Sequence, residues 1–218
     1  MQERMTLSNM SAELGAQAGL IAPDQTTISY LRHANVSEPV DLEYWKTDPA
    51  SEHEVRQFDA GTLEPMVAAP HSPSNTHPVA AMAGTRVQVA YIGACTGAKL
   101  DDLRAAATLL KNRHVDPSVR LLVAPASQQD QRDAQDEGIM DILINAGAQV
   151  FPTSCGACSG YGNALAGASN VISSTARNFK GRMGSAQTNV YLASPYTVAA
   201  SALTGKITDP RIILAEAR

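Results

Sequence analysis

The sequence lacks long hydrophobic runs, a hydrophobic leader and an excess of basic residues. No apolar stretch among its 218 residues approaches the roughly 20 residues that a membrane-spanning helix needs, which argues against a membrane protein. The first ten residues include acidic Glu3 and no apolar core, unlike a signal peptide, so we expect a cytoplasmic protein. The chain has 17 Lys and Arg and 21 Asp and Glu, so it lacks the excess of positive charge that binding to nucleic acid phosphates requires.

Cysteine is also scarce, with three residues in the chain. An odd number cannot pair completely within one chain, and a protein of this size does not need disulfides to fold. The cysteines are therefore candidates for metal binding or for nucleophilic chemistry.

Composition and length place the chain among ordinary globular proteins. Hydrophobic residues make up 44% and charged residues 17% of the sequence, which excludes a disordered or collagen-like protein. At about 150 residues per domain, the length predicts about one and a half domains. We expect part of an α/β domain with a connector over residues 1–85 and a complete α/β domain over residues 86–218.

The N-terminal region predicts two helices. Residues 5–20 carry apolar residues at helical spacing, and Asn9 and Glu13 are four residues apart, which places them on one helix face. Residues 22–31 predict a turn followed by a short helix that Asp24 caps.

A Pro-rich segment follows, over residues 33–86, and its prolines prevent a long helix. We interpret this segment as an ordered but irregular connection between domains.

Strands and helices alternate after residue 86. The predicted strands lie at 87–92, 119–125, 149–151, 171–175 and 189–194. Helices are predicted at 100–112, over 127–148 as one or two helices with Ser127 as a candidate cap, and from Pro195 to just before Gly205. This alternation is typical of βαβ units and predicts an α/β fold with a largely parallel sheet.

Polar loops with all three cysteines follow the predicted strands. Since ligands bind at the carboxyl ends of the strands in open parallel sheets, these loops should share one edge. The residues expected at that edge are Cys95, Cys155, Cys158, Arg177 and Arg182.

The cysteine loops predict an iron–sulfur site. Cys95 stands among small residues in IGACTGAK, and Cys155 and Cys158 have C-x-x-C spacing in TSCGACSGYG. An electron-transfer cluster uses four thiolates, so three cysteines favour a cluster with one iron open to substrate, as catalytic zinc sites keep an open position. A zinc site, a redox dithiol or mere packing remain alternatives. The dithiol is disfavoured because the motif does not directly start a helix, and zinc because no second C-x-x-C or paired His follows.

Two arginines in the segment RNFKGR are candidates for substrate binding. Arg177 and Arg182 flank a Gly-containing turn, and paired guanidinium groups suit the forked recognition of carboxylates. The alternative is a solvated basic turn. Likewise, Asn9 and Glu13 could be a helix cap and a surface acid, and we assign no role to the five scattered histidines.

Taken in order, four segments resemble the iron–sulfur domain of the aconitase superfamily: YIGACTGAKLDDLRAAATLLKNR, FPTSCGACSG, STARNFKGRMGS and YLASPYTVAASALTG. The segment ERMTLSNMSAELGAQAGLIAPDQTT is most similar to the large subunits of 3-isopropylmalate dehydratases and to their homoaconitase relatives. The resemblance extends from about Glu3 to Gly205 and is weakest in the connector. It implies a three-layer α/β/α domain with a largely parallel sheet.

The resemblance also implies a cofactor and a ligand set. One [4Fe-4S] cluster would be held by Cys95, Cys155 and Cys158, and its fourth iron would bind the hydroxyl and a carboxylate of a hydroxy-di- or tricarboxylic acid. Arg177 and Arg182 would hold substrate carboxylates.

For Asn9 and Glu13, the resemblance implies places near the cluster and its bound water, Asn9 as a substrate-binding residue and Glu13 as a catalytic one. The implied reaction is removal and re-addition of water. In leucine biosynthesis it interconverts 2-isopropylmalate and 3-isopropylmalate.

Three residues depart from the family pattern. Ala94 and Gly97 replace the Ser and Asn that usually flank the first cysteine and its Thr, and Ala176 replaces an Asn before Arg177. Because these changes remove polar groups, we expect them to affect cluster stability or substrate choice.

The family's large subunit is also longer than this chain. The resemblance implies that an N-terminal large-subunit portion and a small, swivelling-domain subunit complete the site. Two alternatives stay open: a hydratase of another hydroxy acid, such as homoaconitate or citrate, and a non-catalytic cluster-binding remnant.

Overall fold

The computed structural model describes residues 1–36, 40–160, 165, 167 and 169–216. The chain forms two compact units, Met1–Leu63 and Glu64–Arg218. Residues 64–85, which we had interpreted as part of the connection, thus belong to the second unit. None of the helices in the described ranges is long and apolar enough to cross a membrane.

The first unit consists of short helices joined by extended chain. Its helical elements are α1 (Gln2–Met10), η1 (Ser11–Leu14), α2 (Gln25–His33) and η2 (Ala60–Thr62). The single helix predicted over 5–20 is wrong, because α1 tightens into a 3₁₀ turn after Met10 and Gly15 leaves the helix with a left-handed φ of 79°. No strand is present among the residues described here, so the assignment of this unit to a partial α/β domain remains a prediction.

The start of α2 confirms the predicted cap. Asp24 accepts hydrogen bonds from the backbone N–H groups of Thr26 and Thr27 at 2.8 and 3.3 Å. Arg4 forms an ion pair with the same carboxylate at 2.6 Å, and this partner is the main reason that the pKa of Asp24 lies well below its usual range. The contact ties α1 to α2 within the unit.

The first unit has no core of its own over residues 1–36 and 40–63, none of which is buried. Large apolar side chains are instead open to solvent, among them Leu14, Leu20 and Phe58, which are 88%, 93% and 84% exposed. Large apolar side chains of this kind normally lie inside a fold or an interface.

The second unit is an α/β domain. Its strands are β1 (Met66–Ala68), β2 (Thr76–Pro78), β3 (Val89–Gly93), β4 (Arg120–Ala124), β5 (Ala148–Val150), β6 (Asn170–Ser173) and β7 (Asn189–Ala193). Its helices are α3 (Val79–Met82), α4 (Ala94–Gly97), α5 (Leu100–Leu110), α6 (Gln128–Asp136), α7 (Ile139–Asn145), η3 (Gly156–Ser159), α8 (Pro195–Thr204) and α9 (Pro210–Glu216). The five strands predicted after residue 86 are all present, with ends that differ from the predicted ones by at most two residues.

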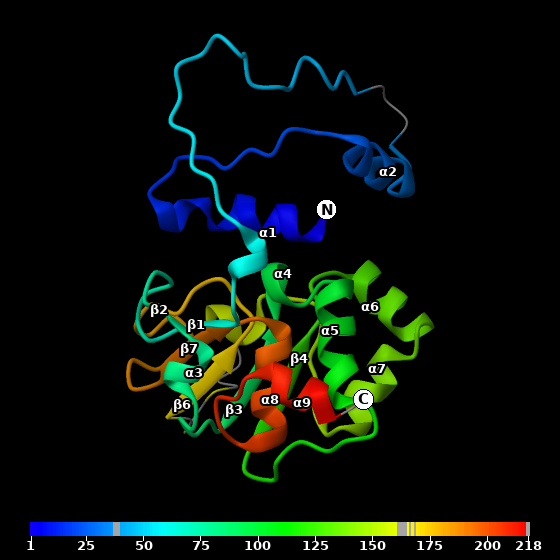
Figure 1. Ribbon diagram of the computed structural model, residues 1–218. Coiled ribbons are helices and arrows are strands. Elements are labelled where there is room, and N and C mark those ends of the chain that lie inside the picture. The colour runs from blue at the N-terminus through cyan, green and yellow to red at the C-terminus, as the bar shows by residue number, and fades with distance from the viewer. Residues whose placement is uncertain (37–39, 161–164, 166, 168, 217–218) are drawn as a thin grey trace. The chain divides into compact units, whose positions relative to one another are not determined.

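The sheet is mixed but mostly parallel, as Figure 1 shows, with the strand order β2-β1-β7-β6-β3-β4-β5. The five strands from β7 to β5 run parallel, whereas β1 pairs antiparallel with both β2 and β7. The two strands β1 and β2 lie in the Pro-rich segment that we expected to be irregular. This expectation was wrong because prolines exclude a long helix but are tolerated beside a short strand such as β1 and within the edge strand β2.

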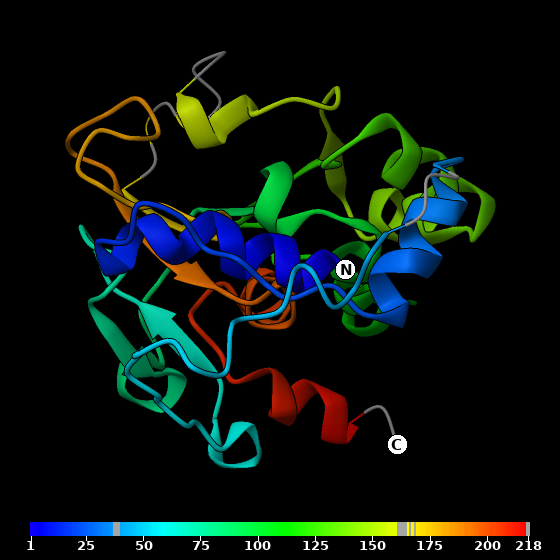
Figure 2. The ribbon, with the colours of Figure 1, turned by 90° about the horizontal axis from the view of Figure 1, so that it is seen from above.

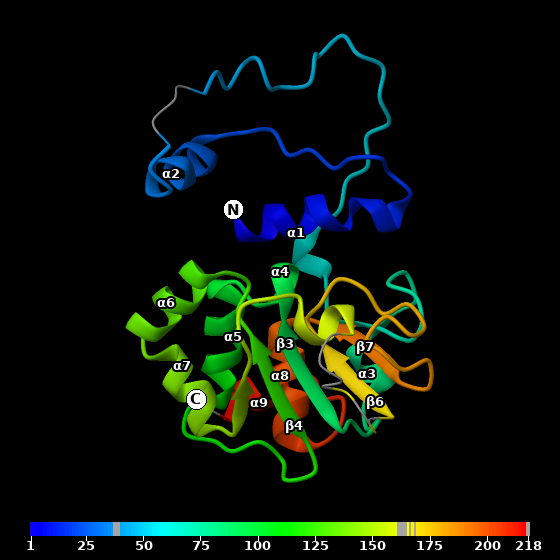
Figure 3. The same cartoon turned by 180° about the vertical axis from the view of Figure 1, so that it is seen from behind.

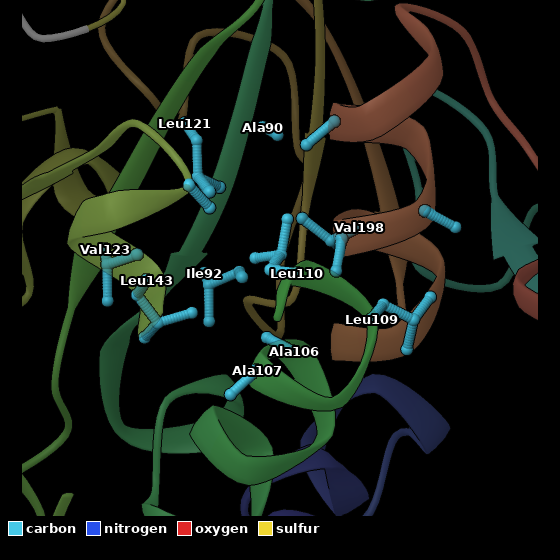
Figure 4. Close-up of a cluster of buried hydrophobic side chains, with 14 of the residues drawn as sticks. Ala90, Ile92, Ala106, Ala107, Leu109, Leu110, Leu121, Val123, Leu143 and Val198 are labelled. Atoms are coloured by element: carbon cyan, nitrogen blue, oxygen red, sulfur yellow. The ribbon is translucent and has the colours of Figure 1, made fainter. Parts of the chain in front are cut away.

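The main core lies between the sheet and helices α5, α7, α8 and α9. Alternate strand residues such as Ala90, Ile92 and Leu121 point to this face and pack against Leu110 and Val198 (Figure 4). The ends of α8 confirm the predicted signals, since Pro195 opens the helix and Gly205 ends it with a φ of 74°; Ser194 caps it as well. One helical layer therefore fixes the strands in place.

The opposite face of the sheet is covered differently. Its buried residues, including Tyr91 and Leu122, pack against Ala157, Cys158 and Met183 from loops and from η3. In Figure 2 the yellow η3 segment lies on one side of the sheet and the red α9 on the other. The predicted three-layer α/β/α arrangement is thus seen only in part, with α5, α7, α8 and α9 as the layer that the described residues establish.

Candidate functional site at the carboxyl edge of the sheet

The first cysteine lies in a tight turn directly after β3. Ala94 opens α4 with a left-handed φ of 65°, a conformation that costs a residue with a Cβ roughly 1 kcal/mol. Cys95 follows and is exposed, while Ala94 and Thr96 on either side are buried. The turn therefore presents one thiol at the edge of the sheet, and Figure 3 shows α4 at the upper end of β3.

Ser174, the residue after β6, holds this turn from the neighbouring strand. Its hydroxyl accepts a hydrogen bond from the N–H of Gly93 at 3.2 Å and donates one to the carbonyl oxygen of Gly97 at 2.7 Å. A Cβ at position 97 would lie 1.9 Å from the carbonyl oxygen of Ser174. The glycine that departs from the family pattern is therefore required by the close approach of these two segments.

The second and third cysteines lie in the loop after β5. The N–H of Cys158 donates a hydrogen bond to the carbonyl oxygen of Cys155 at 3.0 Å, which closes the turn at η3. Cys155 is exposed and Cys158 is buried. The turn ends at Gly160, with a left-handed φ of 79° and the backbone of Gly184 only 3.1 Å from where a Cβ would be.

Tyr91 lies beneath both cysteine loops. Its hydroxyl donates a hydrogen bond to the carbonyl oxygen of Cys155 at 3.3 Å. The ring also passes Gly93 so closely that a Cβ there would lie 2.0 Å from it. Burial raises the pKa of Tyr91 strongly, and the neighbouring thiols of Cys158 and Cys155 raise it further.

The three thiols lie close enough to influence one another. Burial raises the pKa of Cys158, the hydrogen bond and charge of Arg182 lower it, and the charges of Cys155 and Cys95 raise it. The structure thus gathers the cysteines of two distant loops at one edge, as the order of the strands predicted.

One of the two predicted arginines contacts the cysteine loop. Arg182 donates a hydrogen bond from Nε to the carbonyl oxygen of Cys158 at 3.0 Å. Arg177 follows β6 at the same edge of the sheet and is partly buried. Arg182 is otherwise exposed, so this one hydrogen bond leaves the solvated-turn alternative open.

The arginine turn is anchored by Asn178, which sequence reasoning missed. Its fully buried Nδ2 donates hydrogen bonds to the carbonyl oxygens of Ala69 and Val190 at 2.9 and 3.0 Å. A buried amide between two arginines leaves no signal of its own in one sequence. Ser174 and Tyr91 were missed for the same reason.

Asn9 and Glu13 belong to the first unit, at the end of α1 and in η1, and both are partly buried. The prediction placed both residues on one face of a single α-helix, but the chain changes from α-helix to 3₁₀ helix between them. Their roles in a site stay predictions.

The donor set of the second unit fits an iron–sulfur cluster. Within the described part of the chain, no three His, Cys, Asp or Glu residues are arranged to hold a single metal ion. A four-iron cluster makes a different demand, because each thiolate binds a separate iron and the sulfur atoms stand apart. Three thiols in glycine-rich loops, where backbone N–H groups can approach the sulfurs, are donors of the type that such a cluster uses.

Comparison with known proteins decides the family. The model of the aconitase family (aconitate hydratase) matches residues 1–85 and 80–205. The chain belongs to the aconitase family. This membership agrees with the resemblance on which the ligand set was predicted.

Individual relatives of the aconitase family are also similar over almost the whole chain. A protein of Methanothermobacter thermautotrophicus named "Probable 3-isopropylmalate dehydratase large subunit" is 45% identical over 95% of this chain and 49% of its own length. The 3-isopropylmalate dehydratase large subunits of Desulfatibacillum aliphaticivorans and Picrophilus torridus are 40% and 42% identical over 96% and 97% of the chain, and 50% of each relative. The chain spans about half the length of the curated relatives it matches.

Proposed function

We propose that this chain is the cluster-binding part of the large subunit of an aconitase-family hydro-lyase that interconverts 2-isopropylmalate and 3-isopropylmalate in leucine biosynthesis. The observation that carries the proposal is the gathering of Cys95, Cys155 and Cys158 at one sheet edge beside Arg182. The names of the relatives described above support the substrate. A cytoplasmic location and a complete three-layer fold are parts of the same proposal.

In this proposal the three cysteines hold one [4Fe-4S] cluster. When bound, the cluster supplies an iron without a protein ligand, which can act as a Lewis acid toward a substrate hydroxyl. The exposed thiols of Cys95 and Cys155 and the buried thiol of Cys158 come from two loops that Tyr91 and Ser174 hold to the sheet. In this proposal Tyr91 and Ser174 position the two cysteine loops for the cluster.

The arginines orient the substrate in the proposal. A guanidinium group binds a carboxylate through two parallel N–H···O bonds, which fixes direction as well as charge. Arg182 uses its Nε on the carbonyl oxygen of Cys158, so its terminal nitrogens are the groups that we assign to a substrate carboxylate. We assign the second carboxylate to Arg177.

For proton transfer we keep the assignment of Asn9 to substrate binding and of Glu13 to a catalytic role. Further groups, including the base, are proposed to come from an N-terminal large-subunit portion and a small subunit. The exposed apolar side chains of the first unit support this need for partners, because Leu14, Leu20 and Phe58 have no core to enter within the described residues.

The activity test combines the anaerobically reconstituted chain with the N-terminal portion and the small subunit of one relative. The assembled protein should convert 3-isopropylmalate, followed by absorbance of the unsaturated intermediate, and prefer it to homoaconitate and citrate. The Arg182→Lys assembly, measured beside it, should retain iron but turn over slowly. An assembly that contains iron and converts none of these acids would overturn the enzymatic assignment.

A second candidate is a cluster-binding protein without catalysis. It is favoured by Ala176, which is buried where the family pattern has a polar Asn, and by Gly97, whose site leaves no room for the Asn side chain of that pattern. In that case the assembly described above would bind iron without turnover.

A further inference from the structure

Ser174 joins two backbone groups at opposite ends of the first cysteine turn. It is only 8% exposed, and its hydroxyl accepts from the N–H of Gly93 while donating to the carbonyl oxygen of Gly97. Its own N–H donates to the carbonyl oxygen of Tyr91 at 3.0 Å, which continues the parallel pairing of β6 with β3. One side chain therefore closes the turn that carries Cys95.

The turn needs such a support because its own helical bonding is minimal. α4 has four residues and begins at Ala94, whose φ of 65° is unfavourable for a residue with a side chain. Buried backbone groups that lose their partner are costly to the folded state, more so than groups that water can reach. Without the hydroxyl, two buried backbone groups of the turn would lose their bonds together.

Gly97 completes the arrangement from the other side. The carbonyl oxygen and carbon of Ser174 would lie 1.9 and 2.5 Å from a Cβ at position 97. Both atoms belong to the backbone, so they cannot turn aside as a flexible side chain could. We call the pair formed by Ser174 and Gly97 the turn lock.

We propose that Ser174 is a positioning residue that, through the turn lock, fixes the backbone of Cys95 for binding the cluster. The part that concerns the cluster rests on the proposed function, whereas the part that concerns the turn does not. Ser174 itself needs no contact with iron or substrate in this account. Its hydroxyl acts through Gly93 and Gly97 on the thiol between them.

Ser173 provides a matched control in the neighbouring position. It is fully buried, and its hydroxyl donates to the hydroxyl of Thr175 and accepts from the N–H of Thr175, at 3.0 and 3.2 Å. Both of these contacts join Ser173 to Thr175, just beyond the end of β6. Ser173→Ala therefore removes a buried hydroxyl without touching the cysteine turn.

The test compares the full chain with its Ser174→Ala, Ser174→Thr and Ser173→Ala variants. Without iron, amide exchange of the peptide over 93–97 should be about tenfold faster in Ser174→Ala than in the wild type, as loss of a buried hydrogen bond predicts. Ser174→Thr, which keeps the hydroxyl, should restore slow exchange, and Ser173→Ala should match the wild type there. After anaerobic reconstitution, Ser174→Ala should lose its visible iron–sulfide absorbance in air several-fold faster than Ser173→Ala.

Unchanged exchange at 93–97 in a folded Ser174→Ala chain, or an equal increase in Ser173→Ala, would overturn the turn lock. If Ser174→Ala does not fold, Gly97→Ala replaces it, since it keeps the hydroxyl and displaces the carbonyl oxygen of Ser174. That variant should show the same faster exchange, and wild-type exchange in it would also overturn the proposal. A wild-type chain that takes up no iron, combined with fast exchange in Ser174→Ala, would refute the proposed function and leave the turn lock standing.

Discussion

The hydroxyl of Tyr91 donates a hydrogen bond to the carbonyl oxygen of Cys155, 64 residues later in the chain, at 3.3 Å. Tyr91 belongs to β3, which leads into the loop of Cys95, so this bond connects the two cysteine loops. The distance from Tyr91 to a Cβ at Gly156 would be 3.0 Å, which shows how closely the second loop approaches. The cysteines thus share a support inside the domain.

Tyr91→Phe should weaken this support without emptying the core. The variant keeps the ring and removes the bond to Cys155, so the free energy of unfolding should fall by about 1 kcal/mol. Iron retained per chain after reconstitution should fall as well. Chemical denaturation and iron analysis measure the two effects.

Tyr191→Phe is the control for that substitution. Tyr191 lies on the opposite face of the same sheet, packs against the main core and is distant from the cysteine contacts that Tyr91 makes. The Tyr191→Phe variant should retain as much iron as the wild type does. Equal iron loss in both variants would show that the hydroxyl of Tyr91 has no special role.

Arg182→Lys should separate cluster binding from substrate binding. Lys keeps the positive charge but cannot form the planar fork, so iron content should change little while KM rises or kcat falls by about tenfold or more. The comparison is made in the assembled protein. Arg132→Lys, on the exposed helix α6, is the control and should leave both quantities unchanged. Loss of iron in Arg182→Lys equal to that of a cysteine variant would contradict this division of roles.

Asn178→Ala should destabilise the second unit. It leaves the buried carbonyl oxygens of Ala69 and Val190 without their donor, which predicts a loss of about 1–3 kcal/mol in the free energy of unfolding. Asn145→Ala, at the exposed end of α7, should cost far less. Urea unfolding of both variants tests the difference, and equal midpoints would show that the amide does not anchor the arginine turn.

Asp102 makes the free energy of unfolding of the second unit depend on pH. Burial raises its pKa, although the N–H of Lys99 and the charge of Lys99 act in the opposite direction. Because the folded state then holds the proton more tightly than the unfolded state, this stabilisation is complete below the ordinary carboxyl pKa of about 3.9. It is lost as the pH rises through the raised folded-state pKa.

Asp102→Asn should remove this pH-dependent stabilisation while keeping an oxygen that can accept a hydrogen bond from the N–H of Lys99. The stability of the variant relative to the wild type should therefore improve as the pH rises from about 3.5 to about 6. Urea unfolding at several pH values measures the difference. A difference in stability that stays constant over this pH range would show that burial does not raise the pKa of Asp102.

Much of the second unit could be predicted because its signals are local. Short apolar runs predict β3 and β4, and Pro195 and Gly205 mark the ends of α8. The order of strands and loops then predicts which residues share an edge. These predictions succeed where tertiary packing agrees with local preference.

The remaining features depend on contacts between residues far apart in the sequence. Ser174 reaches Gly93 across 81 positions, and Asn178 reaches Ala69 across 109. The strand β1 exists because it pairs with β7, although its own three residues carry little strand signal. Such features arise from the assembled sheet, so one sequence without the structure does not reveal them.

The central claim is that the three cysteines hold one cluster, and the most direct measurement is iron per chain after anaerobic reconstitution with iron and sulfide. The wild type should bind close to four irons with a broad visible absorbance. Cys95→Ser, Cys155→Ser and Cys158→Ser should each lose most of that iron while remaining folded by circular dichroism. A wild-type chain that binds no iron, or three serine variants that bind as much as the wild type, would contradict the account.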